Sequence, residues 1–584
     1  MWYFLKHKLT VTILMTGLLM GFAFQNQDRF GNEPLKYISR EQAYKGKLVM
    51  QCSPDWNIIN IDSLANNISI LPGWGNYAWE ITSASDSAGL YFQQGINMYY
   101  SFHIIEAMAS FKKAQQFDGS NAMIWWSQAL AYGPNINDVE ETFTPDAYHA
   151  AQKAVSLSKD CTPREKALIR AMAVRYQPDN VIKRQILNQR YTDEMKNAFS
   201  QFPGDADIGA LYADAIMVQH PWEYWKHNGD PHPWTPLLTE VLEKTLNIYP
   251  THPGANHYYI HAVEASPDPR RALASANRLS ELLPSVSHMV HMPSHIFIRS
   301  GYYQKGMKVN AMSVTGYNDY RSRFPAVENN APIYLFHNLH MQAACAMFGA
   351  GYEESARIAM DCRNSFDTSY LSLAAPWGSY IQYLYMTPVI NNVRFGKWQP
   401  IIDHPFLDSH HVYANVLLHW AKGIAYARQN NQSAARKELQ LLKAKINKGD
   451  MNVIMQPFNA PSDAAAVAEK MLEGLIAEQA GDLQSAAIAL KEAVFKEGRM
   501  IYNEPKDWIL PVRPYLGAVL LKAGSFAEAE QVFLEDLKEN PGNHWALKGL
   551  QEALLKQQKK PGKTPYQPEK SMAFEGMNDL PIVY

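Results

Sequence analysis

Histidines and one glutamate recur at helical spacings within a short stretch of this 584-residue chain. The first group, with spacing i, i+4, i+7, is His257, His261 and Glu264. The second group, with spacing i, i+3, i+7, is His288, His291 and His295. On a helix, each group would line one face. Two imidazoles one turn apart can bind one ion, because both ring nitrogens reach a metal about 2 Å away. The spacing therefore predicts a metal site.

The two groups are related by a fixed offset. His291 follows His257 by 34 residues, and His295 follows His261 by the same 34. This is the period of a helix-turn-helix repeat of the tetratricopeptide (TPR) kind. The next pair, His337 and His340, falls about one turn out of that register. We expect all three pairs on the first helices of neighbouring repeats, where they would face the concave groove of a superhelix.

The types of the candidate ligands narrow the choice of metal but do not identify it. Imidazole and carboxylate ligands suit zinc, iron, manganese or copper, and Glu264 would act either as a ligand or as the acceptor of an imidazole N–H. The chain lacks the His-Glu-x-x-His motif of metalloproteases, because the residue after His257 is Tyr258 and not the glutamate that acts as general base. Met289 and Met292 would favour copper as ligands, although methionines more often fill gaps in a core. The alternative is that the histidines only pack and form hydrogen bonds. Duplication of a repeat would then copy such a structural histidine into the next repeat with the same 34-residue period.

Helical elements must position these side chains, and the sequence indicates them from about Ala88 onward. Small residues such as Ala107, Gly306 and Ala486 recur where two helices of a repeat would cross, with aromatic or aliphatic residues at the packing positions. We predict an all-α TPR-like superhelix with loop insertions. Its parts are expected to be an irregular lead-in at 24–87, an array with the histidine-rich groove at 88–405, further repeats at 406–556 and a tail at 557–584.

Four segments rich in Pro, Gly, Trp and His interrupt the repeats. They are expected to be irregular spacers that cover one face of the superhelix: Gly133–Pro145, Trp222–Pro236, Tyr317–Pro332 and Pro376–Pro405. Aromatic residues in the second spacer are expected to clamp it onto the scaffold rather than to form a platform for a ligand.

Several blocks resemble a group of exported bacterial TPR proteins. They include Tyr91 to His103, His252-Pro-Gly-Ala-Asn-His-Tyr-Tyr-Ile-His261, His291-Met-Pro-Ser-His-Ile-Phe-Ile-Arg299 and Glu504-Pro-Lys-Asp-Trp508. The similarity extends from about Gly75 to Leu555 and implies the TPR fold. It implies no reaction, because the group has no established activity, so no catalytic residue is transferred.

The N-terminal residues and the net charge bear on the cellular compartment and on the partners of the protein. Lys6 and Lys8 precede an apolar run that ends in Gly21-Phe22-Ala23, which predicts a signal peptide over 1–23 with cleavage after Ala23. An uncleaved anchor helix is the alternative. We therefore expect a periplasmic or secreted protein with no membrane span after cleavage. A formal net charge of −2 gives no basic field for nucleic acid, which we exclude as a partner.

The chain has four cysteines, without a close Cys-x-x-Cys spacing. Cys345 and Cys362 would lie on the two helices of one hairpin, either paired or as buried thiols.

Two functions fit these observations. One is a binding or scaffold protein that recognises a peptide, a protein or a small molecule through the groove, with a metal as part of the surface. The other is a metal-dependent envelope enzyme, a hydrolase or an oxidoreductase, that uses the same histidines.

Overall fold

The structure is a computed structural model that describes residues 56, 59–137, 144–179, 181–323, 331–455 and 458–559. Within these ranges all regular elements are helices, apart from one isolated bridge between Trp225 and Pro231. The all-α prediction is confirmed for this part of the chain. The signal peptide, the start of the lead-in and the tail from residue 560 lie outside the described residues.

The described chain forms a series of consecutive helices joined by turns and loops. The first half contains α4 (Ile61–Asn67), α5 (Asp86–Tyr100), α6 (Ile104–Phe117), α7 (Ala122–Ala131), α8 (Thr144–Leu157), α9 (Pro163–Ala173), α10 (Arg184–Gln201), α11 (Ala206–Gln219), α12 (Thr235–Ile248), α13 (Pro253–Val263), α14 (Leu273–Leu282), α15 (Ser287–His291) and α16 (Pro293–Arg299). The second half contains α17 (Tyr303–Arg323), α18 (Ala331–Gly349), α19 (Tyr352–Asn364), α20 (Trp377–Tyr385), α21 (Thr387–Arg394), α22 (Trp398–Asp403), α23 (Val412–Arg428), α24 (Gln432–Lys443), α25 (Pro461–Gln479), α26 (Leu483–Arg499), α27 (Arg513–Lys522), α28 (Phe526–Glu539) and α29 (His544–Lys556). Short 3₁₀ turns are η1 (Ser158–Asp160), η2 (Pro269–Ala272), η4 (Thr368–Ser372) and η5 (Gly449–Asn452).

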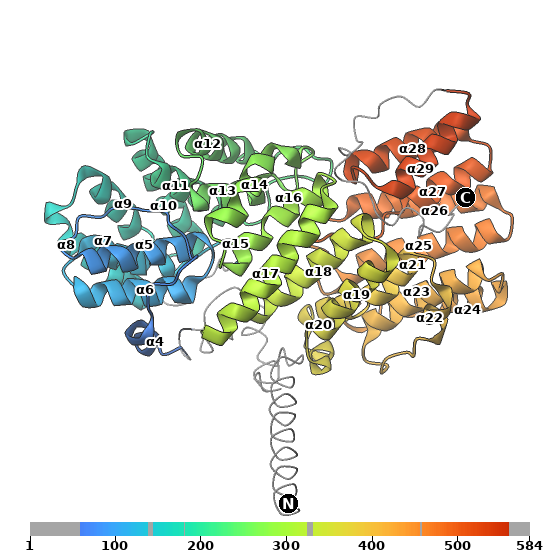
Figure 1. Cartoon of the computed structure of the whole chain (residues 1–584), viewed down its shortest axis with the longest axis horizontal. Helices are drawn as coiled ribbons and strands as arrows, with labels where there is room; N and C mark the ends of the chain where they lie inside the picture. The colour runs from blue at the N-terminus through green and yellow to red at the C-terminus, as the bar shows by residue number, and fades with distance from the viewer. Residues whose placement is uncertain are drawn as a thin grey trace, which may run out of the picture.

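Consecutive helices pack as helix-turn-helix pairs, and each pair packs on the next. The pairs include α5 with α6, α7 with α8, α11 with α12, α13 with α14, α23 with α24, α25 with α26 and α27 with α28. Figure 1 shows the resulting row, with α5 to α8 at one end, α13 to α18 in the middle and α25 to α29 at the other end. This arrangement is the TPR-like superhelix that the sequence predicted.

A close helix crossing recurs within three of the pairs. A Cβ atom added at Gly95, Gly474 or Gly517 would lie 2.3 to 2.7 Å from a large side chain of the second helix. In each pair that side chain comes sixteen positions later, as Phe111, Leu490 and Phe533. Because only glycine leaves room for the large side chain, the two helices approach closely at the same point of each repeat.

Two of the predicted spacers are more helical than expected. Helix α17 continues through Tyr317 to Arg323, and the segment Pro376–Pro405 contains α20, α21 and α22. Helices α20, α21 and α22 have six to nine residues, and a proline lies at the start of α20 and of α21, which masks the helical period in the sequence. The lead-in is irregular as expected at 68–85, but it contains α4.

The side chains form two large hydrophobic cores that meet in the middle of the row. One contains buried residues from Trp74 to Tyr320, and the other contains buried residues from Tyr303 to Ala553. Helix α17 contributes to both. Met289 and Met292 are fully buried in the first core, so packing explains them. Among the described helices, none combines the length and the apolar character that crossing a membrane requires.

Candidate metal centre

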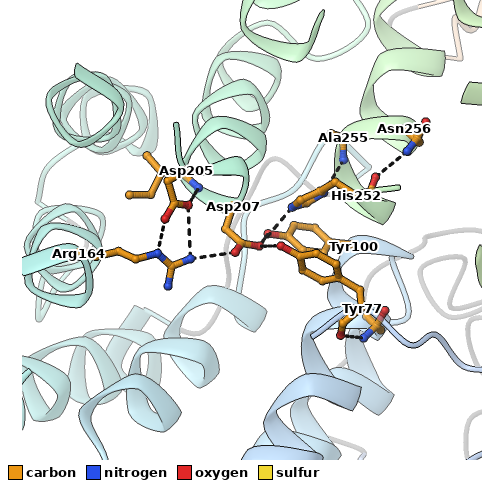
Figure 2. Close-up of polar contacts among 10 residues, drawn as sticks. Tyr77, Tyr100, Arg164, Asp205, Asp207, His252, Ala255 and Asn256 are labelled. Carbon is orange, nitrogen blue, oxygen red and sulfur yellow. Dashed lines mark hydrogen bonds and ion pairs between the residues drawn. The ribbon is translucent and has the colours of Figure 1, made fainter. Parts of the chain in front are cut away.

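Helix α13 carries the first histidine pair, and a buried polar network fixes where this helix begins. His252 is its N-cap, with Nδ1 accepting from the Ala255 amide at 3.0 Å and Nε2 lying 3.2 Å from Asp207 Oδ1. Asp207 also accepts from the hydroxyls of Tyr77 (2.8 Å) and Tyr100 (3.0 Å) and pairs with Arg164 (2.8 Å). Figure 2 shows Asp207 between Arg164 and this group. The network ties α5, α9, α11 and α13 together and so sets the position of the histidine helix.

A helix break positions the second set of histidines. Helix α15 ends at His291 and α16 begins at Pro293, with Met292 as the shared cap. Proline cannot donate the hydrogen bond that would continue α15, and it favours the first position of a new helix. His288 and His291 therefore lie on one short helix and His295 lies on the next.

The described histidines come together as two clusters of three. In each cluster the candidate ligand atoms lie within 4.8 Å of one another: His257, His261 and His288, and His291, His295 and His337. The first cluster joins α13 to α15, and the second joins α15, α16 and α18. The two clusters adjoin, because the ring centroids of His261 and His295 are 6.0 Å apart and those of His288 and His291 are 6.2 Å apart.

The Nδ1 atoms of four histidines point outward to fixed acceptors. His257 Nδ1 donates to the Tyr100 carbonyl at 2.7 Å, and His291 Nδ1 donates to Asn310 Oδ1 at 2.7 Å. His261 and His295 donate to the two oxygens of Glu264 at 2.8 and 2.6 Å. Each Nδ1 thus carries a proton, which leaves the Nε2 atom to bind a metal. Metal-binding histidines almost always have such a partner on the other ring nitrogen.

The Nε2 atoms converge in the interior. His288 Nε2 lies 3.1 Å from His257 Nε2, while His291 Nε2 lies 2.7 Å from His295 Nε2 and 3.0 Å from His337 Nε2. Two nitrogens that bind one ion at about 2.0 to 2.1 Å in tetrahedral geometry stand about 3.3 Å apart. A small outward shift of the rings would therefore accommodate an ion in each cluster.

Hydrogen bonding alone does not satisfy the second cluster. Asn310 Nδ2 donates to the Gly306 carbonyl, so Asn310 Oδ1 is the acceptor and His291 Nε2 keeps its lone pair. Two other Nε2 atoms, from His295 and His337, point at this one lone pair. In the first cluster, His261 Nε2 is buried with no hydrogen-bond partner among the described residues. A metal ion would satisfy all of these atoms, because it accepts lone pairs from several directions.

Two carboxylates lie directly behind the histidines. Glu264, the C-cap residue of α13, occupies the position of an imidazole N–H acceptor, one of the two roles that the sequence allowed. Glu504 was not among the predicted site residues, although the resemblance block contains it. Its side chain lies 2.8 Å from His295 Nδ1 and also contacts Glu264. Only tertiary packing brings the segment around Glu504 to helices more than 200 positions earlier.

The six histidines of the two clusters are mostly buried. His257 and His291 are 0% exposed, and only His337 of the six is more than 9% exposed. The Phe102 ring lies 4.6 Å from the His257 ring, and the Trp222 ring lies 5.1 Å from the His261 ring. These bulky residues come from the turn after α5 and from the second spacer, so both loops contact the histidines.

Burial determines the charge of most of these histidines. It lowers the pKa of His261 to about 4 and that of His337 to about 3, and it holds the pKa values of His257, His288 and His291 well below the usual range. Burial also lowers the pKa of His295, but Glu504 and Glu264 outweigh it and raise this pKa to about 10. Five of the imidazoles are therefore neutral at pH 7, whereas His295 must release a proton to bind a metal.

His340, the remaining predicted ligand, does not join either cluster. It is buried next to the Tyr383 ring, at a centroid distance of 5.5 Å, and burial lowers its pKa to about 3. It follows His337 by only three residues, but the turn of α18 directs it to the other core. The structure therefore removes His340 from the predicted ligand set.

The other sequence candidates have structural roles. Trp225 Nε1 donates to the Ala262 carbonyl at 2.8 Å, and the Trp234 ring is stacked between His220 and His232, so the second spacer is clamped onto α13. Cys345 and Cys362 are free, buried thiols. Asp408, His410 and His411 form a further cluster with ligand atoms within 4.8 Å, mostly at the surface.

Comparisons with known proteins leave the family open. The search for protein-family models found no match, and no curated protein sequence matches the chain. The similar solved structures include a human IFIT1 dimer with m7Gppp-AAAA, with 11% identity, a TM-score of 0.31 and coverage of 88% of this chain and 99% of that one. The Cut9 chain of the Cut9-Hcn1 complex has 12% identity, a TM-score of 0.29 and coverage of 81% and 78%. Yeast Tom70 has 10% identity, a TM-score of 0.24 and coverage of 81% and 90%. At these values we transfer no ligand or activity, and the fold assignment rests on the helix packing described above.

Proposed function

We propose that this protein is a metalloprotein in which a TPR-like superhelix encloses two transition-metal ions, each bound by three histidines. The observation that carries the proposal is the pairing of ring nitrogens. Four Nδ1 atoms are hydrogen-bonded to fixed acceptors, whereas two Nε2 atoms point at the single lone pair of His291 and His261 Nε2 has no partner among the described residues. Histidines with a structural role alone would pair both ring nitrogens with hydrogen-bond partners, and His261 does not.

The enclosed position of the centre bears on what the metal does. A peptide lying in a groove would not reach histidines that are buried behind Phe102 and Trp222. We therefore propose that the metal centre is an internal part of the protein and does not bind a partner directly. Partner binding, which a TPR-like scaffold fits well, would use other surfaces of the superhelix.

Metal-dependent catalysis is the second candidate function. It is favoured by the partial exposure of His337 and of Glu504, which contacts His295. An ion of the second cluster that keeps an open ligand position could activate a bound water or small molecule.

We propose that the segment 1–23 directs export and is removed after Ala23, so that the metalloprotein acts in a periplasm or outside the cell.

The test is elemental analysis of protein purified without chelator. We expect about two transition-metal ions per chain, and a loss of at least one of them in each of the variants His261→Ala and His295→Ala. His149→Ala, which changes an exposed histidine outside the centre, serves as the control. A protein that carries no stoichiometric metal, and whose thermal midpoint in added metal is the same for all three variants, would show that the histidines are structural.

A further inference from the structure

We propose that a cleft in the second half of the superhelix binds a methylated ammonium group, such as the trimethylammonium head of a larger molecule. The cleft lies where α20, α23 and the start of α25 meet the segment around Asp507 (Figure 1). None of its lining residues belongs to the proposed metal centre. Three observations support the assignment: the aromatic wall, a carboxylate without a cationic partner, and the size of the cleft.

Tyrosine rings form much of the wall of the cleft. Tyr383 on α20 and Tyr413 on α23 are stacked, with ring centroids 5.9 Å apart and an angle of 9° between the planes. The Tyr383 hydroxyl accepts from the Ile509 amide at 3.1 Å, which holds this ring in place. Tyr380, one turn before Tyr383, is partly exposed and also lines the cleft. Such rings attract cations, because the face of an aromatic ring carries partial negative charge.

The carboxylate of Asp507 lies in the same cleft and is partly exposed. Asn459 Nδ2 donates to its Oδ2 atom and Asn503 Nδ2 donates to its Oδ1 atom, both at 2.8 Å. Among the described residues, Asp507 forms no ion pair with Lys, Arg or His and accepts no backbone N–H. The charged group that acts on it is a second carboxylate, Asp463. The two neutral amides therefore fix the position of Asp507 without balancing its charge.

This unbalanced charge favours a cationic ligand. Burial raises the pKa of Asp507 from 3.8 to about 6, against the amide hydrogen bonds that lower it, so the carboxylate is ionised at pH 7. A partly buried carboxylate without a cationic partner costs free energy, which a cation in the cleft would offset.

The lining also selects among cations. A primary ammonium group has three N–H donors to satisfy, and this cleft provides one ionised carboxylate between tyrosine and proline side chains. A methylated ammonium group has fewer donors or none, and its methyl groups contact aromatic rings favourably. The donor and acceptor balance of the cleft therefore suits the methylated group.

The size of the cleft limits how much of a ligand it holds. It contains about 370 Å³ of empty space, part of which is open to solvent. A compact head group fits into this space, whereas the rest of a larger molecule would extend into solvent. We therefore expect recognition of the head group alone.

The test is calorimetric titration of the full-length protein with choline. A parallel titration uses the uncharged isostere of choline, in which a carbon atom replaces the nitrogen. We expect saturable binding of about one choline per chain and binding of the isostere that is weaker by about 10-fold or more, because only choline carries the charge that pairs with Asp507.

Two variants test the residues of the cleft. Asp507→Asn should weaken choline binding by about 10-fold or more, because it removes the charge and keeps the shape. Asp536→Asn is the matched control, since Asp536 also accepts from two asparagine side chains and burial also raises its pKa to about 6, but it does not line the cleft. Tyr380→Ala, which removes a partly exposed ring, should weaken binding by roughly 3- to 30-fold. Circular dichroism checks that each variant is folded.

The outcomes decide the assignment. Equal affinity for choline and its isostere, or an Asp507→Asn variant that binds choline as tightly as Asp536→Asn, would overturn it. Absence of choline binding, or saturable binding of glucose in its place, would also overturn it, since tyrosines and a carboxylate suit sugar hydroxyl groups as well. None of these outcomes depends on the metal centre, because the cleft shares no residue with it.

Discussion

The sequence could identify the residues of the centre that follow a helical or repeat spacing, but not those that tertiary packing brings there. The spacing predicted His257, His261, His288, His291, His295 and His337, because they follow the helical and repeat periods. It could not predict Glu504 or Asn310, whose side chains reach the histidines through tertiary packing. It wrongly included His340, because spacing along a helix does not reveal which core the side chain faces.

The buried carboxyl of Asp214 allows a prediction about pH at the residue scale. Burial raises the pKa of Asp214, whose carboxylate accepts from the Tyr99 hydroxyl, from 3.8 to about 6. Between these values the folded protein holds a proton that the unfolded chain has released. The contribution of Asp214 to the free energy of unfolding therefore falls as the pH rises from 3.8 to about 6, and it is constant above.

Urea denaturation across this range checks the prediction. The difference in unfolding free energy between the parent protein and Asp214→Asn should change between pH 4 and pH 6, because asparagine does not titrate. A difference that stays constant over this range would contradict the raised pKa.

At the scale of elements, the centre depends on how helices begin and end. The break at Pro293 lets two short helices carry histidines into one cluster, and the N-cap network around Asp207 fixes the start of α13. The helices within Pro376–Pro405 were missed, because segments of six to nine residues show too little of the helical period.

Glycines at helix crossings provide the element-scale prediction. In Gly517→Ala the new methyl group would lie 2.4 Å from the Phe533 ring, so we expect a loss of roughly 1 to 3 kcal/mol of stability. Gly498→Ala is the control, because nothing lies within 4 Å of the added atom on an exposed turn of α26, and alanine should stabilise that helix by roughly 0.5 to 1 kcal/mol. Denaturant midpoints of the two variants should shift in opposite directions, and equal shifts would contradict the close crossing.

At the scale of the molecule, the centre lies where two hydrophobic cores meet. Helices α13 to α16 belong mainly to the first core, whereas α18 and the segment that carries Glu504 pack with the second. Ions that join His291 and His295 to His337 would therefore connect the two halves of the superhelix. The sequence predicted the repeats but not this junction, because each repeat pattern specifies only its own hairpin and its neighbours.

This position predicts a stabilisation of the whole array by metal. At a free metal concentration 100-fold above the dissociation constant, binding to the folded state should add about 2.7 kcal/mol per site. The thermal midpoint of metal-free protein should rise on addition of the metal, and proteolysis between the two halves should slow. His337→Ala, which removes the ligand from α18, should lose most of both effects, whereas an undiminished response in this variant would argue against a connection through the centre.

Anomalous diffraction at the metal absorption edge, from crystals of protein purified without chelator, locates the ions directly. We predict two peaks in the interior, one among the Nε2 atoms of His257, His261 and His288, and one among those of His291, His295 and His337. Peaks only at surface groups such as Asp408, His410 and His411, or no peak in the interior of a well-ordered crystal, would contradict the six-histidine centre.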